Sequence, residues 1–576
     1  MRSKLRALLK QELIIGFIAS ALILTCNVAS NSSSPPFSSS FYRFPQQSAY
    51  TVNEDTLNKD LFLTHGVASG DVTNHSAIIW ARVNKQAQMY VEYDNNPNFL
   101  HPSSSTGNLA NQSTDFTSKI KLEGLNPHTR YYYRVWFADA TNQVSRNDDP
   151  STTSKSVVGT FVTAPATLPL STSKRVPVSF IFGADVGGQK YCRPVDKGGY
   201  SIFAKMEELS PDFFIDNGDM IYADDTCPSD GPDGPGGWQN IPGNFSAIND
   251  PKINWTDLDQ VRNVYLRHWQ YNHADPYLQN FLENTSMYSQ WDDHEVINDF
   301  GAPWTYWNSA NKDRVGYPNI VNVGRDAFFS YSPIDRNHDD PNRIYRSFSW
   351  GPDLDVLIID ARSYRSLNSL ADTPENNKTL LGSEQLHWLE QSLLNSKATW
   401  KVISSDVPIS FPTGSNASIF GHDGWASGNE TANPTSQTGF EREFQSLVRF
   451  LDENNIKNVV FVTTDVHFAA NIKYELDANG DGDKLLFYEL VSGPLSAIRV
   501  GMPAGFPLPK LDTTFNPTLL YQEGGIFNFG YIRIDNNNNT SSSHGNTVNG
   551  KAHLIADVRG EDGNPRPHSS INLSPQ

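Results

Sequence analysis

The sequence has little cysteine, no excess of basic residues and no long apolar run beyond its first thirty residues. Three cysteines among 576 residues allow at most one disulfide bond. A formal net charge of -18 disfavours nucleic-acid binding as a main function, and the lack of a later apolar run argues against a transmembrane span. No repeat of solenoid or propeller period is found. Hydrophobic residues make up 38% of the chain, enough for a sizeable core, and the length predicts at least two domains.

The first thirty residues have the pattern of an export signal. A basic start at residues 4–10 precedes an apolar run at 13–24, and small residues at 28–30 offer a cleavage site. Cys26 loosely resembles a bacterial lipidation site, but the threonine before it fits that pattern poorly. We therefore predict a signal peptide at 1–30 and a secreted, periplasmic or cell-surface protein.

Two cysteines remain if Cys26 is removed with the signal. Cys192 and Cys227 could form a disulfide bond in an oxidising compartment. They could also be two free thiols, or one of them could bind a metal. The sequence alone leaves these alternatives open.

Short strands and turns follow a Ser- and Pro-rich flexible leader at 31–59. Residues 77–83 and 88–93 have strand patterns, and a turn leads into a tyrosine-bearing strand at 131–135. This pattern predicts an all-β domain at 60–164, a sandwich of the immunoglobulin or fibronectin type III kind.

After a Thr-, Pro- and Ser-rich linker at 165–175, strands alternate with helices. We expect an α/β domain over 176–576, with buried central strands in a layered sheet core flanked by helices. The predicted strands are 176–182, 212–215, 354–359, 400–403 and 459–462, and the predicted helices are 200–209, 383–394 and 440–451.

Acidic and histidine side chains recur directly after these strands. One such residue is often only a turn or a helix cap, but four strand ends with the same chemistry point to a shared site. Carboxylates and imidazoles bind divalent and trivalent cations, and a carboxylate can bridge two metals that activate water against a phosphoryl group. The clusters contain Asp185, then Asp219 and Tyr222, then Asp293 and His294, and last Asp465 and His467.

Several longer motifs resemble those of the alkaline phosphatase D family, within the metallophosphoesterase superfamily. The similarity runs from about residue 66 to 494, and its motifs together are specific although each alone is weak. They are 66–71 with 80–82, 218–222, 291–295, 360–365, 381–385 with 388–389, and 465–468. The resemblance implies a metallophosphoesterase-type layered sheet and phosphoester hydrolysis.

The resemblance also implies an Fe³⁺ and Ca²⁺ site, with Asp219 bridging the metals and Tyr222 binding iron. Asp465 and His467 would be further ligands, and Asp293 would take the place of an asparagine ligand in related phosphoesterases. His294 would face the substrate phosphate.

Arg362 is a candidate phosphate clamp, since a guanidinium can bind phosphate through two nitrogens. A structural ion pair with Asp360 is the alternative. Asp406, after a predicted strand, stands where the superfamily often has a metal-binding histidine.

The chain departs from the family pattern after the first strand of the α/β domain. Asp185 stands where many members have an iron-binding cysteine, and Gly187 where the wider superfamily has a histidine. Other divalent ions such as manganese or zinc are therefore possible beside calcium. Residues 477–483 carry oxygen donors at alternate positions, and we interpret them as an acidic hairpin turn in preference to a structural calcium loop.

These observations predict a secreted, monomeric alkaline phosphatase that releases phosphate from small or polymeric phosphomonoesters. One alternative is a phosphodiesterase on nucleic-acid or lipid headgroups that uses the same metals. The other is a non-catalytic, calcium-binding surface protein.

Overall fold

A computed structural model describes most of the chain from residue 60 onward. The predicted signal peptide and leader lie outside the described residues, as does most of the predicted linker. In the described part of the chain, no helix combines the length and apolar character that a membrane crossing requires. The described residues are 60–139, 151–167, 176–301, 316–414, 417–428, 437–501, 508–535 and 552–576.

In the N-terminal part, the described residues between 60 and 164 form seven strands and one short 3-10 helix, η1 (Gln112–Thr114). Side chains of β3 and β6 alternate between buried and partly exposed, so Val91 and Tyr133 point into one apolar core with Ile79 and Phe161. The strands are β1 (Leu63–Gly70), β2 (Ser76–Val83), β3 (Ala87–Asp94), β4 (Ser103–Ala110), β5 (Thr117–Glu123), β6 (Arg130–Ala138) and β7 (Val157–Val162).

This part is joined to the rest of the protein by backbone pairing. β4, β3, β6 and β7 form a separate four-stranded sheet, whereas β1, β2 and β5 belong to a nine-stranded sheet. The link is a parallel pair between Gly70 of β1 and Met287 of β10. The nine-stranded sheet has the order β20-β19-β18-β8-β9-β10-β1-β2-β5. Its other strands are β8 (Val178–Gly183), β9 (Phe213–Asp216), β10 (Ser286–Ser289), β18 (Asn528–Asp535), β19 (His553–Gly560) and β20 (Ile571–Leu573).

A seven-stranded sheet has the order β11-β12-β13-β14-β16-β15-β17. Its central strands β12, β13, β14 and β16 are parallel, which agrees with the apolar runs in the sequence because parallel sheets are buried on both faces. The strands are β11 (Arg346–Trp350), β12 (Leu354–Ile358), β13 (Trp400–Ser404), β14 (Val459–Thr463), β15 (Ala469–Leu476), β16 (Leu485–Val491) and β17 (Pro517–Glu523).

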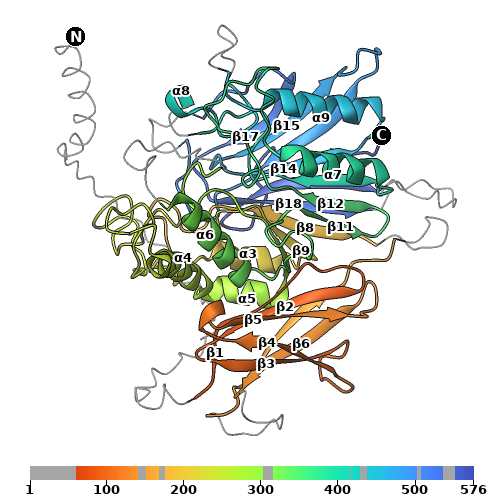
Figure 1. Ribbon diagram of the computed structural model, residues 1–576. Helices are drawn as coiled ribbons and strands as arrows, with labels where there is room; N and C mark the ends of the chain where they lie inside the picture. The colour runs from red at the N-terminus through yellow and green to blue at the C-terminus, as the bar shows by residue number, and fades with distance from the viewer. Residues whose placement is uncertain are drawn as a thin grey trace, which may run out of the picture. The chain divides into compact units, whose positions relative to one another are not determined.

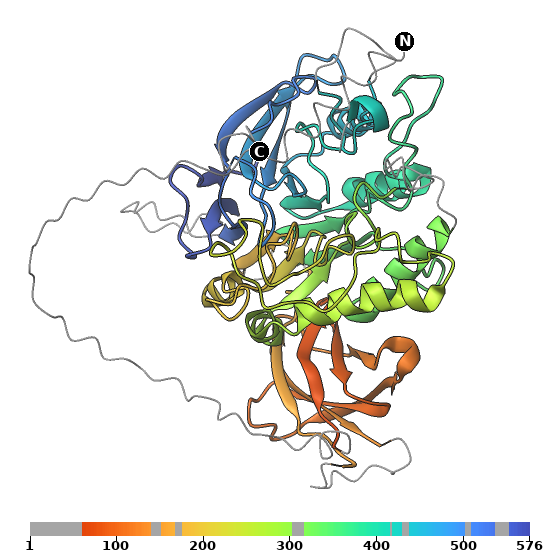
Figure 2. The same ribbon diagram turned by 90° about the vertical axis from the view of Figure 1, so that its left-hand side faces the viewer.

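The two large sheets pack face to face, and helices cover their outer faces (Figure 1). Val402 of β13 packs with Phe180 of β8 between the sheets, while its neighbour Ile403 packs outward with α7 and α9. Helices α3 to α6 cover the outer face of the nine-stranded sheet. For example, Phe203 of α3 and Phe281 of α5 pack in one cluster with Phe214 of β9. Each fully buried side chain of this size contributes about 1.5–3 kcal/mol. Figure 2 shows the layers after a quarter turn.

The predicted helices at 200–209, 383–394 and 440–451 are confirmed within two residues at either end, and α4 to α6 were not predicted. Aspartates fix two of these starts, because Asp257 and Asp275 each accept hydrogen bonds from backbone N–H groups of the first turn. The helices are α3 (Ile202–Glu208), α4 (Leu258–His273), α5 (Pro276–Asn284), α6 (Tyr317–Tyr331), α7 (Gly382–Asn395), α8 (Ala417–Phe420) and α9 (Glu441–Glu453).

Candidate active site

The loops that follow β8, β9, β10, β13 and β14 carry the candidate site residues. Because β8, β9 and β10 are parallel to one another and β13 is parallel to β14, each group of loops leaves its sheet at one edge. Four of the residues have left-handed backbone conformations, which cost energy and concentrate at functional sites. They are Asp185 (φ 68°), Asp219 (φ 53°), Asp465 (φ 74°) and His467 (φ 57°).

Tyr222 lies between Asp185 and His467. Its hydroxyl is 3.2 Å from Asp185 Oδ1 and 3.2 Å from His467 Nε2. The second oxygen of Asp185 accepts a hydrogen bond from Thr464 Oγ1 at 3.0 Å, and His467 Nδ1 lies 2.7 Å from the carbonyl oxygen of Ile498. His467 therefore turns Nε2 toward the tyrosine and the aspartate.

Asp293 is shared by three groups of possible metal ligands whose donor atoms lie within 4.8 Å of one another. His294 also donates its backbone N–H to Asp219 Oδ1 at 3.1 Å, which ties the loops after β9 and β10 together. The three groups are Asp219 with Asp293 and His294, Asp292 with Asp293 and Asp465, and Asp293 with Asp299 and Asp423.

Several of these carboxylate oxygens are buried without a hydrogen-bond donor among the described residues: Asp219 Oδ2, Asp292 Oδ2, Asp293 Oδ1 and Asp406 Oδ2. Burial, and then repulsion from Asp293 and Asp292, raises the pKa of Asp219 well above its usual value. Burial likewise raises the pKa of Asp465. Since buried carboxylates in such numbers need counter-charge, the donor set fits bound cations.

His294 pairs with Asp224, a contact that the sequence did not predict. Its Nδ1 lies 2.6 Å from Asp224 Oδ1, and its ring packs against Tyr222 at a tilt of 31° with a centroid distance of 4.0 Å. Burial alone would lower the pKa of His294, but the charges of Asp224 and Asp293 raise it to about 10. Nε2 remains directed toward Asp293, 3.9 Å from its Oδ1.

Glu295 holds the loops of the site by accepting backbone hydrogen bonds. Its carboxylate accepts from the N–H groups of Asp219 at 3.0 Å, Met220 at 2.8 Å and Asp292 at 2.8 Å. This residue was part of a recognised motif, yet a local pattern could not show which backbone groups it would bind.

Arg362 is completely buried among carboxylates. Its Nε donates to Asp292 and its Nη1 donates to Asp423 at 2.6 Å, while Nη2 lies 3.6 Å from Asp465 Oδ1. The alternative interpretation of Arg362, a side-chain ion pair with Asp360, is wrong, since Asp360 instead accepts the backbone N–H of Arg362 at 3.1 Å. The side chain of Arg362 extends toward the acidic residues of the site, because its buried positive charge requires several negatively charged partners.

Asp406 lies behind the same arginine. Its Oδ2 is 3.7 Å from Arg362 Nε, and its Oδ1 accepts from Gln290 Nε2 at 3.3 Å. Burial raises the pKa of Asp406 to about 7.

The two cysteines left open by the sequence form a disulfide bond. Cys192 and Cys227 lie in the loops after β8 and β9, with Cα atoms 5.8 Å apart. The bond therefore joins the loop of Asp185 to the loop of Asp219 and Tyr222.

The acidic segment at 477–483 forms the turn of the hairpin between β15 and β16, which confirms the hairpin interpretation. Its side chains bind its own backbone, as when Asp477 Oδ1 accepts from the Gly480 N–H at 2.7 Å.

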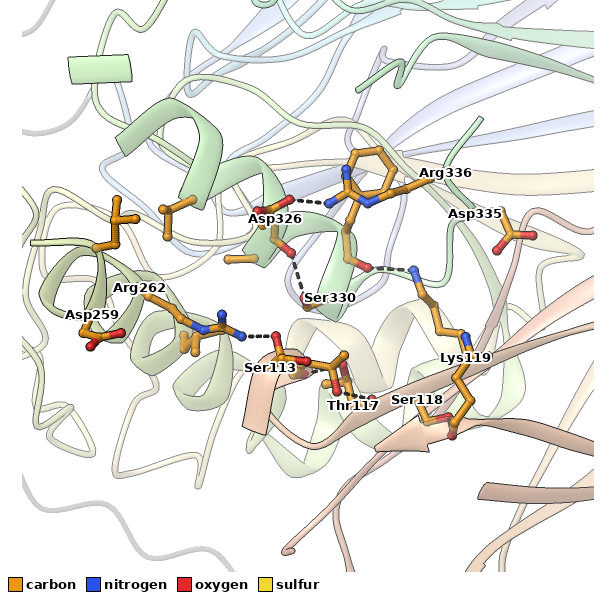
Figure 3. Close-up of a pocket in the computed structure, with 17 residues that line it drawn as sticks. Ser113, Thr117, Ser118, Lys119, Asp259, Arg262, Asp326, Ser330, Asp335 and Arg336 are labelled. Atoms are coloured by element: carbon orange, nitrogen blue, oxygen red, sulfur yellow. Dashed lines mark hydrogen bonds and ion pairs between the residues drawn. The ribbon is translucent and has the colours of Figure 1, made fainter. Parts of the chain in front are cut away.

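A separate cavity of about 710 Å³ lies between β5, α4 and α6 (Figure 3). Two of its cationic side chains have partners within the protein, since Lys119 donates to the carbonyl oxygens of Phe329 and Ile334 and Arg336 pairs with Asp326. None of the candidate metal ligands lines this cavity. The cavity is therefore separate from the cluster of acidic and histidine side chains at the strand ends.

Two stacked sheets covered by helices, with acidic, tyrosine and histidine side chains after their strands, define a protein of the metallophosphoesterase type. The chain belongs to the PhoD-like phosphatase family, because the sequence model of that family matches residues 182–544. The model of the N-terminal domain of PhoD-like phosphatases matches residues 47–165. The resemblance inferred from the sequence is thus confirmed. Family membership supports phosphoester hydrolysis.

Similar proteins agree with this assignment. Alkaline phosphatase D of Bacillus subtilis (strain 168) is 25% identical over 480 residues, which cover 78% of this chain and 72% of that protein. A solved structure of PhoD is similar with a TM-score of 0.62 and 19% identity, covering 89% of this chain and 88% of that one. Purple acid phosphatase PPD1 from yellow lupin seeds has a TM-score of 0.51 and 12% identity, covering 88% and 73%. The two structures show a shared fold.

Proposed function

We propose that the protein is an exported, metal-dependent phosphoester hydrolase of the alkaline phosphatase type, which releases inorganic phosphate from phosphomonoesters. The observation that carries this proposal is the sharing of Asp293 among three largely buried groups of possible ligands, found among the described residues, that contain carboxylate oxygens without hydrogen-bond donors. A fold alone would not require such a concentration of buried negative charge.

The distances support a proposal of two adjoining metal subsites. Asp185, Tyr222 and His467 meet around the phenolic oxygen, a donor set suited to Fe³⁺. Asp293 and Asp465 supply only oxygen donors and suit Ca²⁺, with Asp406 as a further oxygen behind them. Asp219, whose Oδ2 has no donor among the described residues, is the proposed bridge between the two.

Bound metal ions would supply Lewis acidity to the phosphoryl group and activate the attacking water. The role of His294 follows from its contacts, because Asp224 holds Nδ1 and leaves Nε2 directed into the site. We assign Nε2 to binding a phosphate oxygen and to protonating the leaving oxygen.

Arg362 is better placed to balance the metal-binding carboxylates than to clamp the substrate. Its guanidinium is fully buried, and two of its nitrogens are held by Asp292 and Asp423. Only Nη2, which lacks a hydrogen-bond partner among the described residues, is available near Asp465.

The proposal includes the organisation expected from the sequence. Residues 1–30 would direct export, 60–164 would form an immunoglobulin- or fibronectin-like domain, and 176–576 would form the catalytic domain of a monomer. The pairing of β1 with β10 would then hold the two domains in one arrangement.

The test is phosphate release by the purified protein before and after removal of metals with a chelator. We expect p-nitrophenyl phosphate hydrolysis to be lost on chelation and restored by iron with calcium, with elemental analysis following both ions. Much faster cleavage of bis(p-nitrophenyl) phosphate would establish a diesterase instead. Metal binding without any hydrolysis would favour the non-catalytic surface protein, and hydrolysis that survives complete metal removal would end the proposal.

A further inference from the structure

A second cationic side chain, Arg499, lies in the segment that supports the proposed metal ligands. The residue before it, Ile498, provides the carbonyl oxygen 2.7 Å from His467 Nδ1, and the next residue, Val500, donates its N–H to the carbonyl of His467 at 3.1 Å. Ser496 of the same segment donates its backbone N–H to the carbonyl of Asp185 at 2.8 Å. The backbone on both sides of Arg499 therefore adjoins two proposed metal ligands, Asp185 and His467.

The guanidinium of Arg499 rests on an aromatic shelf, formed by Tyr191, Trp238 and Phe527. The three rings meet edge to face with centroid distances of 5.4 to 5.9 Å. Cζ of Arg499 is 4.5 Å from the centroid of Phe527 and 5.2 Å from that of Tyr191. Such contacts hold an arginine by its faces and leave the edge N–H groups to bind a ligand.

The shelf is anchored to the loop of Asp185. Ser496 Oγ donates to the carbonyl oxygen of Tyr191 at 2.8 Å, and the disulfide bond begins at the next residue, Cys192. The aromatic residues that hold Arg499 are therefore connected to the loop that carries Asp185.

Among the described residues no ion pair joins Arg499 to a carboxylate, and its Nε is buried without a hydrogen-bond acceptor. By comparison, Arg362 and Arg365 each donate to the carboxylate of Asp423. The chain has 63 acidic against 45 basic residues, so an unpaired arginine beside the site is unexpected. Leaving a partly desolvated guanidinium without an anion costs free energy, which an anionic ligand would recover.

We infer that Arg499 binds a second anionic group of the substrate, apart from the phosphate that is hydrolysed. The preferred substrates would then be phosphate esters that also carry a carboxylate or another phosphate. This inference rests on the proposed phosphoester hydrolase function and makes Arg499 a specificity residue of the same site.

The test compares phenyl phosphate with 4-carboxyphenyl phosphate, and AMP with adenosine 3′,5′-bisphosphate, so that each pair differs by one anionic group and both members are phosphate monoesters. Arg499→Gln removes the charge, Arg499→Lys keeps it without the planar fork, and Arg449→Gln makes the same charge change on the exposed face of α9. For Arg499→Gln we expect the KM of the more anionic member of each pair to rise about tenfold. The KM of phenyl phosphate and AMP, kcat and metal content should stay within twofold, and Arg499→Lys should recover part of the loss.

Three outcomes would overturn the inference: equal changes for both members of a pair, changes matched by Arg449→Gln, or loss of metal from Arg499→Gln, which would make the arginine a support for His467. If the metal-loaded wild type hydrolyses no ester, the proposed function fails separately. Calorimetric binding of phenyl phosphate and 4-carboxyphenyl phosphate would then still show whether Arg499 distinguishes them.

Discussion

Gly188 offers a direct test of the tyrosine in the site, because a side chain there would displace Tyr222. A Cβ at Gly188 would lie 2.4 Å from Tyr222 Cζ, whereas ordinary contact begins at 3.4 Å. In Gly188→Ala the ring must therefore move by about 1 Å, the difference between these distances. Its hydroxyl would then leave the position 3.2 Å from both Asp185 and His467.

The expected result is a fall in phosphate release of about 100-fold, the typical effect of a 1 Å misplacement in an active site. Overpacking should also lower the free energy of unfolding by about 1–3 kcal/mol. Gly183→Ala is the matched control, because its Cβ would meet Leu495 at an ordinary 3.4 Å. Tyr222→Phe removes the hydroxyl without moving the ring, so it should also lower phosphate release and metal content, with less effect on Tm.

The test of Tyr222 as a metal ligand measures activity, metal content and thermal unfolding in the three variants. Full metal occupancy and activity in both Gly188→Ala and Tyr222→Phe would refute the assignment of Tyr222 as a metal ligand. A stability loss in Gly183→Ala as large as that in Gly188→Ala would show that the steric reasoning is wrong.

Three further predictions concern other parts of the structure. Asp224→Asn should lower kcat about tenfold or more without loss of metal, because it weakens the hold on His294 Nδ1; unchanged pH–rate profiles would contradict this. Burial lowers the pKa of His273 from 6.5 to about 4. Between these two pH values the imidazole is protonated in the unfolded chain and neutral in the folded protein, so acidification favours unfolding. Stability should thus drop by about 2 kcal/mol between pH 7 and pH 5, and denaturation of His273→Phe should lack this component. Replacing Cys192 and Cys227 together by serine should lower the unfolding free energy by about 3–4 kcal/mol, given their separation of 35 residues, and equal Tm values would contradict it.

Much of the layered core could be predicted from the sequence. The strands β8, β9, β12, β13 and β14 are short apolar runs because both faces of each are buried between a sheet and helices. Helices α4 to α6 were missed, since their buried positions are partly filled by polar and aromatic residues such as His268 and Trp269. Tertiary packing outweighs a weak local pattern in such segments.

The amino-acid sequence by itself determined which donor side chains stand at the strand ends, among them Asp219 and His467, because residue type and strand position are local properties. Only the tertiary structure decided which of them face one another. Asp224 reaches His294 and Arg362 reaches Asp423 across 70 and 61 residues of chain. Such partners are selected by how the sheets and loops pack, since charges that leave water must find counter-charges wherever the fold brings them.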